Sequence, residues 1–192
     1  MAEPVRVAIL ISGRGSNMLS LVRASRAADS PYQVVRVLSN VEDAPGLRLA
    51  AEEGVATWTR SHRGMKRAEF DALIDAELRA AQVELLALAG YMRLLSPEFI
   101  AGWEGRILNI HPSLLPLYKG LDTHQRAIEG GDTEAGCSVH VVTAELDDGP
   151  VIAQARVPIL PGDTTDSLAE RVLEEEHRLY AEALTEYARS LR

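Results

Sequence analysis

The stretch at residues 107–116, ILNIHPSLLP, predicts a buried β-strand that ends at a proline. Residues two apart along a strand share a face, so Asn109 and His111 point to the same layer. The apolar residues Leu108 and Ile110 face the opposite layer, and the following proline cannot donate to the ladder. Functional groups of open α/β sheets gather at the carboxyl ends of strands. The stretch therefore predicts an α/β protein with a polar site at this strand end.

Asn109 and His111 suggest a particular kind of chemistry. An amide and an imidazole side by side can donate two hydrogen bonds to one developing oxyanion. A nearby carboxylate would hold the imidazole in its charged form, and Asp147 is the candidate. The alternative is structural, because an asparagine and a histidine at a strand end also cap loops and satisfy local backbone groups.

A second site is predicted near the N-terminus, where the apolar run from Val5 to Ile11 leads into the loop SGRGSN (residues 12–17) and a helix over residues 18–28. Glycines let the backbone approach an anion, and the amides at a helix start bind phosphate without a lysine. The loop lacks both the Lys-Ser/Thr ending of a P-loop and the third glycine of a dinucleotide fingerprint. The alternative is a tight turn in which Ser16 is the N-cap.

The remaining pattern alternates strands and helices, which predicts a Rossmann-like, mostly parallel central sheet with helices on both faces. An antiparallel strand pair is expected near the C-terminus, and 1–192 is expected to form a single domain. We expect strands at 33–38, 85–89, 136–143 and 151–157, and helices at 45–53, 67–81, 97–102, 124–129 and 164–191. Residues 55–58 fit a short edge strand or a packed loop equally well.

Composition narrows the class of protein. The chain has 192 residues, a formal net charge of −8 and 46% hydrophobic residues, which disfavours a broad nucleic-acid or membrane surface. Cys137 is the only cysteine, so no intrachain disulfide forms and a packing role is expected. The apolar run near the N-terminus is too short for a signal peptide. We expect a cytoplasmic protein, monomeric or homodimeric, that acts on small molecules.

Two segments, NIHPSLLP (residues 109–116) and ELDDGP (residues 145–150), resemble the signature of the folate-dependent formyltransferases. Nearly the whole chain is similar to the members of that family that act on phosphoribosylglycinamide in purine biosynthesis. The resemblance implies transfer of a formyl group from 10-formyltetrahydrofolate, as co-substrate, to the amine of 5-phosphoribosylglycinamide. It implies neither a protein nucleophile nor a metal, and the five histidines lack metal-ligand spacing.

The resemblance also assigns roles to individual residues. The implied catalytic residues are Asn109, His111 and Asp147. The implied contacts to phosphoribosylglycinamide are Gly15, Ser16, Asn17, Pro112 and Glu176. The implied folate contacts are Arg67, Met92, Arg93, Leu94, Leu95, Asn109, Thr143, Leu146 and Asp147. Without the resemblance, the arginine at 67 would be a solvated charge and residues 92–95 would be core. His140 is left outside the catalytic set, as one more side chain in an alternating strand.

Two positions depart from the family pattern, and two alternative functions stay open. Asp122 stands where some bacterial members have histidine, and Asp148 stands where a glycine is more common. One alternative keeps the folate site but changes the acceptor, as in methionyl-tRNA formyltransferase or formyltetrahydrofolate deformylase, whose extra domains 192 residues cannot supply. The other is a nucleotide- or folate-binding module without catalysis.

Overall fold

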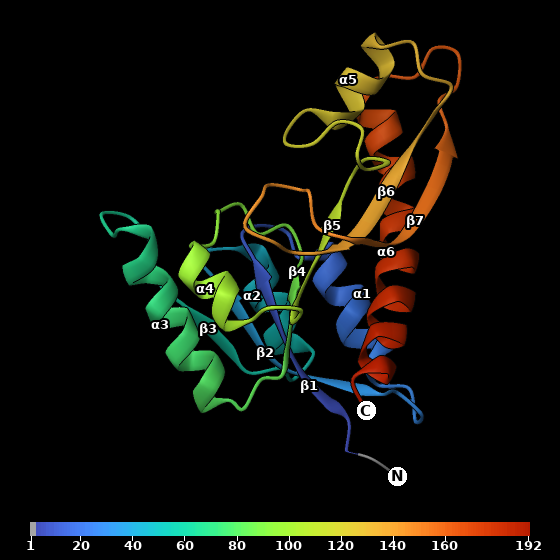
Figure 1. Ribbon diagram of the computed structural model, residues 1–192. Coiled ribbons are helices and arrows are strands. Elements are labelled where there is room, and N and C mark those ends of the chain that lie inside the picture. The colour runs from blue at the N-terminus through green and yellow to red at the C-terminus, as the bar shows by residue number, and fades with distance from the viewer. Residues whose placement is uncertain (1–2) are drawn as a thin grey trace.

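A seven-stranded mixed sheet forms the centre of the protein in the computed structural model, which describes residues 3–192 (Figure 1). The strand order is β3-β2-β1-β4-β5-β6-β7, and the first five strands are mutually parallel. β6 runs antiparallel to both of its neighbours. The strands are β1 (Val5–Ile11), β2 (Tyr32–Ser39), β3 (Thr57–Thr59), β4 (Leu85–Leu88), β5 (Ile107–His111), β6 (Glu134–Val141) and β7 (Val151–Pro158).

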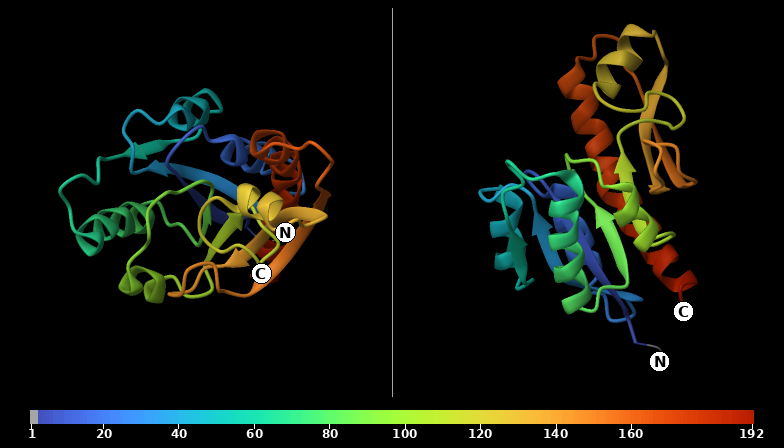
Figure 2. Two further views of the ribbon diagram at one scale, coloured as in Figure 1. Left: turned by 90° about the horizontal axis from the view of Figure 1, so that it is seen from above. Right: turned by 60° about the vertical axis from the view of Figure 1, so that its left-hand side comes forward.

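Helices cover both faces of this sheet, and Figure 2 shows α3 and α4 on the side opposite α1, α2 and α6. The strands alternate accordingly. In β1, Val7 and Ile9 enter the core beneath α1 and α6, whereas Ala8 and Leu10 enter the core beneath α3 and α4. The helices are α1 (Ser16–Ala24), α2 (Pro45–Glu52), α3 (Arg67–Ala80), α4 (Pro97–Gly102), α5 (Thr123–Glu129) and α6 (Thr165–Ser190).

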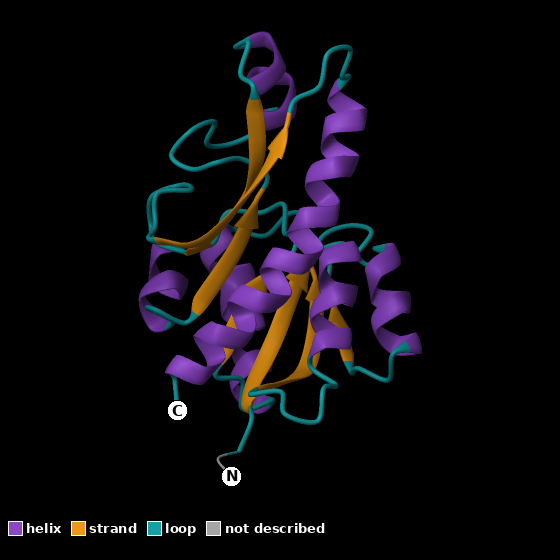
Figure 3. Cartoon of the chain, turned by 90° about the vertical axis from the view of Figure 1, so that its right-hand side faces the viewer, coloured by secondary structure: helices purple, strands orange, loops and turns teal. Residues whose placement is uncertain are grey.

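The long helix α6 crosses the sheet beside β5, β6 and β7 (Figure 3). Its N-cap is Thr164, whose side chain accepts a hydrogen bond from the Ser167 amide. Midway along it, the buried Tyr180 hydroxyl lies 3.0 Å from the Leu88 carbonyl and 3.1 Å from the Leu108 carbonyl. Tyr180 therefore ties α6 to β4 and β5 close to the strand ends where the predicted site lies.

The predicted class and strand arrangement are confirmed, and the differences lie mainly at element ends. The clearest error concerns α1, which was predicted over residues 18–28 but begins at Ser16 and ends at Ala24. Its N-cap is Gly15 and makes no side-chain capping bond, so Ser16 is not the cap. The helix stops early because Ser25 donates its hydroxyl to the Val22 carbonyl at 2.7 Å, which satisfies a terminal carbonyl locally.

Among residues 3–192, no helix combines the length and the apolar character needed to cross a bilayer.

Candidate active site

The site is built at the carboxyl end of β5. Asn109 and His111 share one face of this strand, while Leu108 and Ile110 enter the core beneath α1 and α6. His111 is buried, and Asn109 is partly exposed. Because β1, β4 and β5 are parallel, the turn after β1 and the segment after β4 lie at the same edge of the sheet. Both predicted substrate regions therefore lie at the same edge of the sheet as the end of β5.

Asp147 reaches this strand end from the connection between β6 and β7. Its Oδ2 atom lies 3.4 Å from Nδ1 of His111, and its Oδ1 atom lies 3.7 Å from Nε2 of His140. The same Oδ2 accepts a hydrogen bond from the Gly120 amide at 2.9 Å. The Asp147 backbone adopts a φ of +49°, a left-handed conformation that aspartate tolerates better than most residues. The carboxylate is thereby held between two imidazole rings.

Both ring nitrogens of His111 face hydrogen-bond acceptors. Nε2 lies 2.9 Å from the Tyr118 carbonyl oxygen, which can only accept. Nδ1 faces the Asp147 carboxylate. Nε2 therefore donates to the Tyr118 carbonyl, and the Asp147 carboxylate lies beside the other ring nitrogen. In this conformation the Tyr118 carbonyl therefore occupies one of the two ring nitrogens of His111 that could donate to the expected oxyanion.

His140 also lies in the site, although its place in an alternating strand predicted an ordinary strand side chain. It lies directly opposite Asn109 in the antiparallel pairing of β5 with β6, and its Nε2 is 3.1 Å from Nδ2 of Asn109. Its Nδ1 faces the Val141 carbonyl at 3.3 Å, so Nε2 accepts from the amide. Burial lowers the His140 pKa, which suits this neutral role. The register between β5 and β6 places it beside Asn109.

The glycine turn lies at the carboxyl end of β1. Gly15 has a φ of +78°, and a Cβ atom there would lie 2.8 Å from the Gly46 Cα. The Gly46 amide in turn donates to the Gly13 carbonyl at 3.0 Å. Only glycine fits at position 15, because the turn packs closely against the start of α2. The turn leads directly into Ser16 and Asn17 of α1.

Glu176 approaches this turn from α6. Its Oε2 accepts a hydrogen bond from Nδ2 of Asn17 at 2.7 Å, across 159 residues of sequence. Burial raises the Glu176 pKa, and the Asn17 bond partly offsets that shift. The buried Oδ1 of Asn17 has no hydrogen-bond partner within residues 3–192. A buried carboxyl group beside an unsatisfied amide oxygen is a polar surface suited to hydroxyl groups.

The residues predicted to contact folate differ in exposure. Met92, Leu94 and Leu146 expose 69%, 53% and 55% of their surface, whereas Leu95 is part of the core beneath α3 and α4. Arg93 lies over the Phe70 ring at 5.1 Å. The three exposed apolar side chains come from the segment after β4 and from the connection that carries Asp147. They are therefore available to an apolar ring, and Leu95 instead anchors its segment.

The other predicted contacts lie at the same edge of the sheet. Arg67 is the first residue of α3, exposed, and follows the carboxyl end of β3. Thr143 is partly buried at the start of the connection that holds Asp147. Of the two departures from the family pattern, Asp148 is exposed and pairs with Lys119, and Asp122 is exposed at the N-cap of α5.

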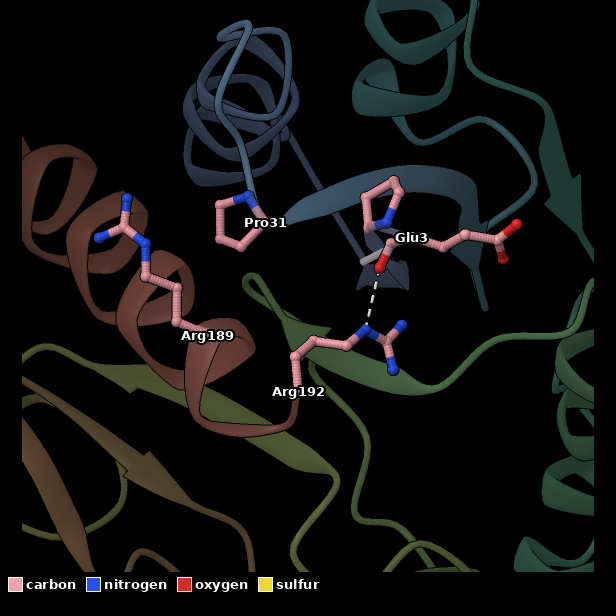
Figure 4. A pocket seen from close by; sticks show the side chains of 5 residues that line it. Glu3, Pro31, Arg189 and Arg192 are labelled. Atoms are coloured by element: carbon pink, nitrogen blue, oxygen red, sulfur yellow. Dashed lines mark hydrogen bonds between the residues drawn. The ribbon is translucent and has the colours of Figure 1, made fainter. Parts of the chain in front are cut away.

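Of two further cavities, one lies close to the site and the other lies far from it. One of about 10 Å³ lies beneath the loop after β5, where Pro112 and Tyr118 line it, and it has room for about one water molecule. Another of about 170 Å³ is lined by Glu3, Pro31, Arg189 and Arg192 (Figure 4) and lies near the amino ends of β1 and β2. Arg192 is paired there with Glu84 and with the Glu3 carbonyl. This second cavity is at the opposite edge from Asn109.

An amide, an imidazole and a carboxylate at the carboxyl ends of a parallel sheet, beside a glycine turn, define an α/β enzyme acting on small molecules. Residues 5–184 match a family model described as formyl transferase, and the chain belongs to this family.

Several relatives share most of the chain. Phosphoribosylglycinamide formyltransferase of Escherichia coli (strain K12) is 43% identical over 185 residues, covering 96% of this chain and 87% of that protein. The crystal structure of phosphoribosylglycinamide formyltransferase from Brucella melitensis is 50% identical, with a TM-score of 0.93 over 97% of this chain and 96% of that one. The trifunctional purine biosynthetic protein adenosine-3 of Gallus gallus is 45% identical over 181 residues, but this chain covers only 18% of its length.

Proposed function

We propose that the protein transfers the formyl group of 10-formyltetrahydrofolate to the primary amine of 5-phosphoribosylglycinamide, in purine biosynthesis. The products are formylglycinamide ribonucleotide and tetrahydrofolate. The observation that carries the proposal is the Asp147 carboxylate between His111 of β5 and His140 of β6. Relatives named phosphoribosylglycinamide formyltransferase support the choice of acceptor. We expect the protein to work in the cytoplasm as a monomer or homodimer.

The reaction is a direct acyl transfer between two bound molecules. The amine nitrogen attacks the formyl carbon, a C–N bond forms, and the carbonyl oxygen becomes negative. Asn109 uses one N–H of its amide on His140, which leaves the second for this oxygen. The positive charge of His111 stabilises the same oxygen. Nε2 of His111 now bonds to the Tyr118 carbonyl. It can donate to the negative oxygen of the intermediate only if that oxygen takes the place of this carbonyl.

Breakdown of the intermediate moves one proton. The bond between the carbon and N10 of the folate breaks, and the proton that the attacking nitrogen loses ends on N10. Asp147 is the base nearest to His111 and is suited to accept that proton, directly or through water. Its second task is electrostatic, since a carboxylate beside His111 favours the charged ring.

The glycine turn and α6 are assigned to the acceptor substrate. Backbone amides at Gly15, Ser16 and Asn17 lie at the start of α1, where the helix dipole favours a phosphate. Glu176 is the acceptor for ribose hydroxyls, beside the unsatisfied oxygen of Asn17. On the donor side, the main chain of residues 92–95 binds the edge of the pterin, and the exposed apolar side chains cover its faces.

Glu176→Gln tests the acceptor site. Burial raises the Glu176 pKa, so the folded state binds the carboxyl proton more tightly than the unfolded chain does. This difference stabilises the folded state at low pH, and the stabilisation is lost as pH rises through the folded-state pKa of Glu176. The glutamine side chain still offers an oxygen that accepts the hydrogen bond from Asn17, but it has no carboxyl group to titrate. We expect a higher free energy of unfolding than wild type at alkaline pH, together with a raised KM for phosphoribosylglycinamide. Denaturant titrations at acidic and alkaline pH, with steady-state kinetics, measure both; an unchanged KM would contradict the ribose role.

The proposed activity is tested by incubating the pure protein with 10-formyltetrahydrofolate, with and without phosphoribosylglycinamide, and following the release of tetrahydrofolate. We expect release only when the amine is present, and the same rate after treatment with EDTA. Release without the amine would identify a deformylase. The absence of any release, with folate still bound, would identify a binding module. A loss of activity in EDTA that a divalent ion restores would contradict the metal-free mechanism.

A further inference from the structure

The segment from Gly90 to Ser96 joins β4 to α4, and it is held at both ends by side chains from other elements. It carries the four residues 92–95 that the proposed function assigns to the formyl donor. Since that function uses main-chain groups of the segment, the path of the backbone decides how well the donor fits. The residues that fix this path are therefore of interest, although they need not touch the donor.

Ser12, at the end of β1, holds the first part of the segment. Its amide donates to the Gly90 carbonyl at 3.0 Å, and its hydroxyl oxygen accepts from the Met92 amide at 2.8 Å. The hydroxyl proton goes to Oδ1 of the buried Asn40 at 2.6 Å, so the hydroxyl has one orientation. Asn40 in turn lies 3.0 Å from Nδ1 of His62. Ser12 also begins the glycine turn, so one residue borders both predicted substrate sites.

Asp71, on α3, holds the other end. Its side chain is 1% exposed, and Oδ2 accepts from the Ser96 amide at 2.6 Å. Oδ1 has no hydrogen-bond partner in residues 3–192, and neither do the buried Tyr91 hydroxyl and the Arg93 Nε atom. Burial raises the pKa of Tyr91, and the negative charge of Asp71 raises it further. Residues from the segment thus surround a buried carboxylate.

A buried carboxylate in this position is expensive for the fold. Desolvation of a charge is unfavourable unless hydrogen bonds and opposite charges compensate it. Here the Ser96 amide donates one hydrogen bond to Oδ2, and Arg93 of the same segment lies over the neighbouring Phe70 ring. An apolar residue at position 71 would pack beneath α4 at lower cost. The hydrogen bond that Asp71 accepts therefore links α3 to the segment.

We propose that Ser12 and Asp71 are positioning residues, which hold the backbone between Met92 and Leu95 in the conformation that binds the formyl donor. The inference rests on the proposed function. It predicts that changes at Ser12 or Asp71 weaken donor binding selectively, although both side chains belong to elements outside the segment. It also predicts that the acceptor substrate, bound at the glycine turn, is largely unaffected by a change at position 71.

The test compares Asp71→Ala, Asp71→Asn and Ser12→Ala with wild type. Asp75→Ala is the matched control, because Asp75 lies one turn later on α3 and binds the Trp103 indole at 2.7 Å instead of the segment. KM for 10-formyltetrahydrofolate and KM for phosphoribosylglycinamide are measured separately, with thermal unfolding of each variant. We expect Asp71→Ala to raise the donor KM about tenfold, the scale of one lost buried hydrogen bond. Asp71→Asn keeps an oxygen that accepts from the Ser96 amide, so its donor KM should stay close to that of wild type.

For Ser12→Ala we expect a smaller rise in the donor KM, because the Met92 amide is near the surface and can bind water. Asp75→Ala should lower the melting temperature and leave both KM values unchanged. The inference is overturned if Asp71→Ala and Ser12→Ala lower the melting temperature but not donor affinity, or if both KM values rise together. Should Asp71→Ala fail to fold, the same criteria apply to Ser12→Ala. An inactive wild type would instead overturn the proposed function.

Discussion

Asp147→Asn is expected to lower kcat by about 10²- to 10⁴-fold, the range for loss of a general acid or base. The substitution preserves the size of the side chain and an oxygen that can accept from the Gly120 amide. It removes the negative charge that lies 3.4 Å from His111 and 3.7 Å from His140. The charged form of His111 loses its support, and the attacking amine loses its nearest base. Rapid-mixing or steady-state measurements at saturating concentrations of both substrates give kcat directly.

Asp148→Asn is the matched control for this prediction. Asp148 is the next residue, but its carboxylate is exposed and pairs with Lys119 at the surface. Exposed ion pairs contribute about 0–1 kcal/mol to stability and are screened by salt. We therefore expect little change in kcat. If Asp147→Asn lowered kcat by less than about tenfold, which corresponds to about 1.4 kcal/mol of barrier, the catalytic role of Asp147 would be refuted.

Asn109→Ala is expected to lower kcat by about 10²- to 10³-fold, because removal of one oxyanion donor costs about 2.7–4 kcal/mol of transition-state stabilisation. The variant also leaves Nε2 of His140 without the amide that now lies 3.1 Å away. Since the oxyanion exists only in the transition state, kcat and kcat/KM should fall together while KM stays nearly constant. Steady-state kinetics with each substrate varied in turn distinguish these patterns.

Asn109→Asp separates the donor from the volume of the side chain. The carboxylate has nearly the same shape as the amide but cannot donate, and its charge repels a developing oxyanion. We expect turnover at least as slow as in Asn109→Ala. A large rise in KM with an unchanged kcat in either variant would show that Asn109 binds substrate without stabilising the transition state. Circular dichroism of both variants verifies that the sheet is intact.

Much of the fold was predictable from the sequence because it is encoded locally. Buried parallel strands are continuous apolar runs, so β1 was predicted with its observed bounds, Val5–Ile11. Glycine and proline mark the ends of such runs, which placed α4 correctly after Ser96. The alternation along β5 likewise placed Asn109 and His111 on one face. Where a local side chain competes with the helix, as Ser25 does at the end of α1, the predicted boundary was wrong.

The site was only partly predictable. His140 was interpreted as an ordinary strand residue, and the buried Asp71 was not distinguished from the exposed charges of α3. Each acquires its role from a partner far along the chain, 31 residues away for the Asn109–His140 contact and 25 for the Asp71–Ser96 contact. The Tyr118 carbonyl at His111 is a further example, since it depends on the path of a loop with little periodicity.

The sequence by itself determined the class of fold, the strand that carries the amide and the imidazole, and the glycine turn, because spacing along a strand or turn fixes which side chains share a face. Only the tertiary structure decided which groups those side chains meet. The register between β5 and β6, the left-handed backbone at Asp147 and the packing of α6 against the glycine turn bring distant residues within hydrogen-bonding reach. Such contacts depend on how whole elements pack against one another, and no local pattern encodes them.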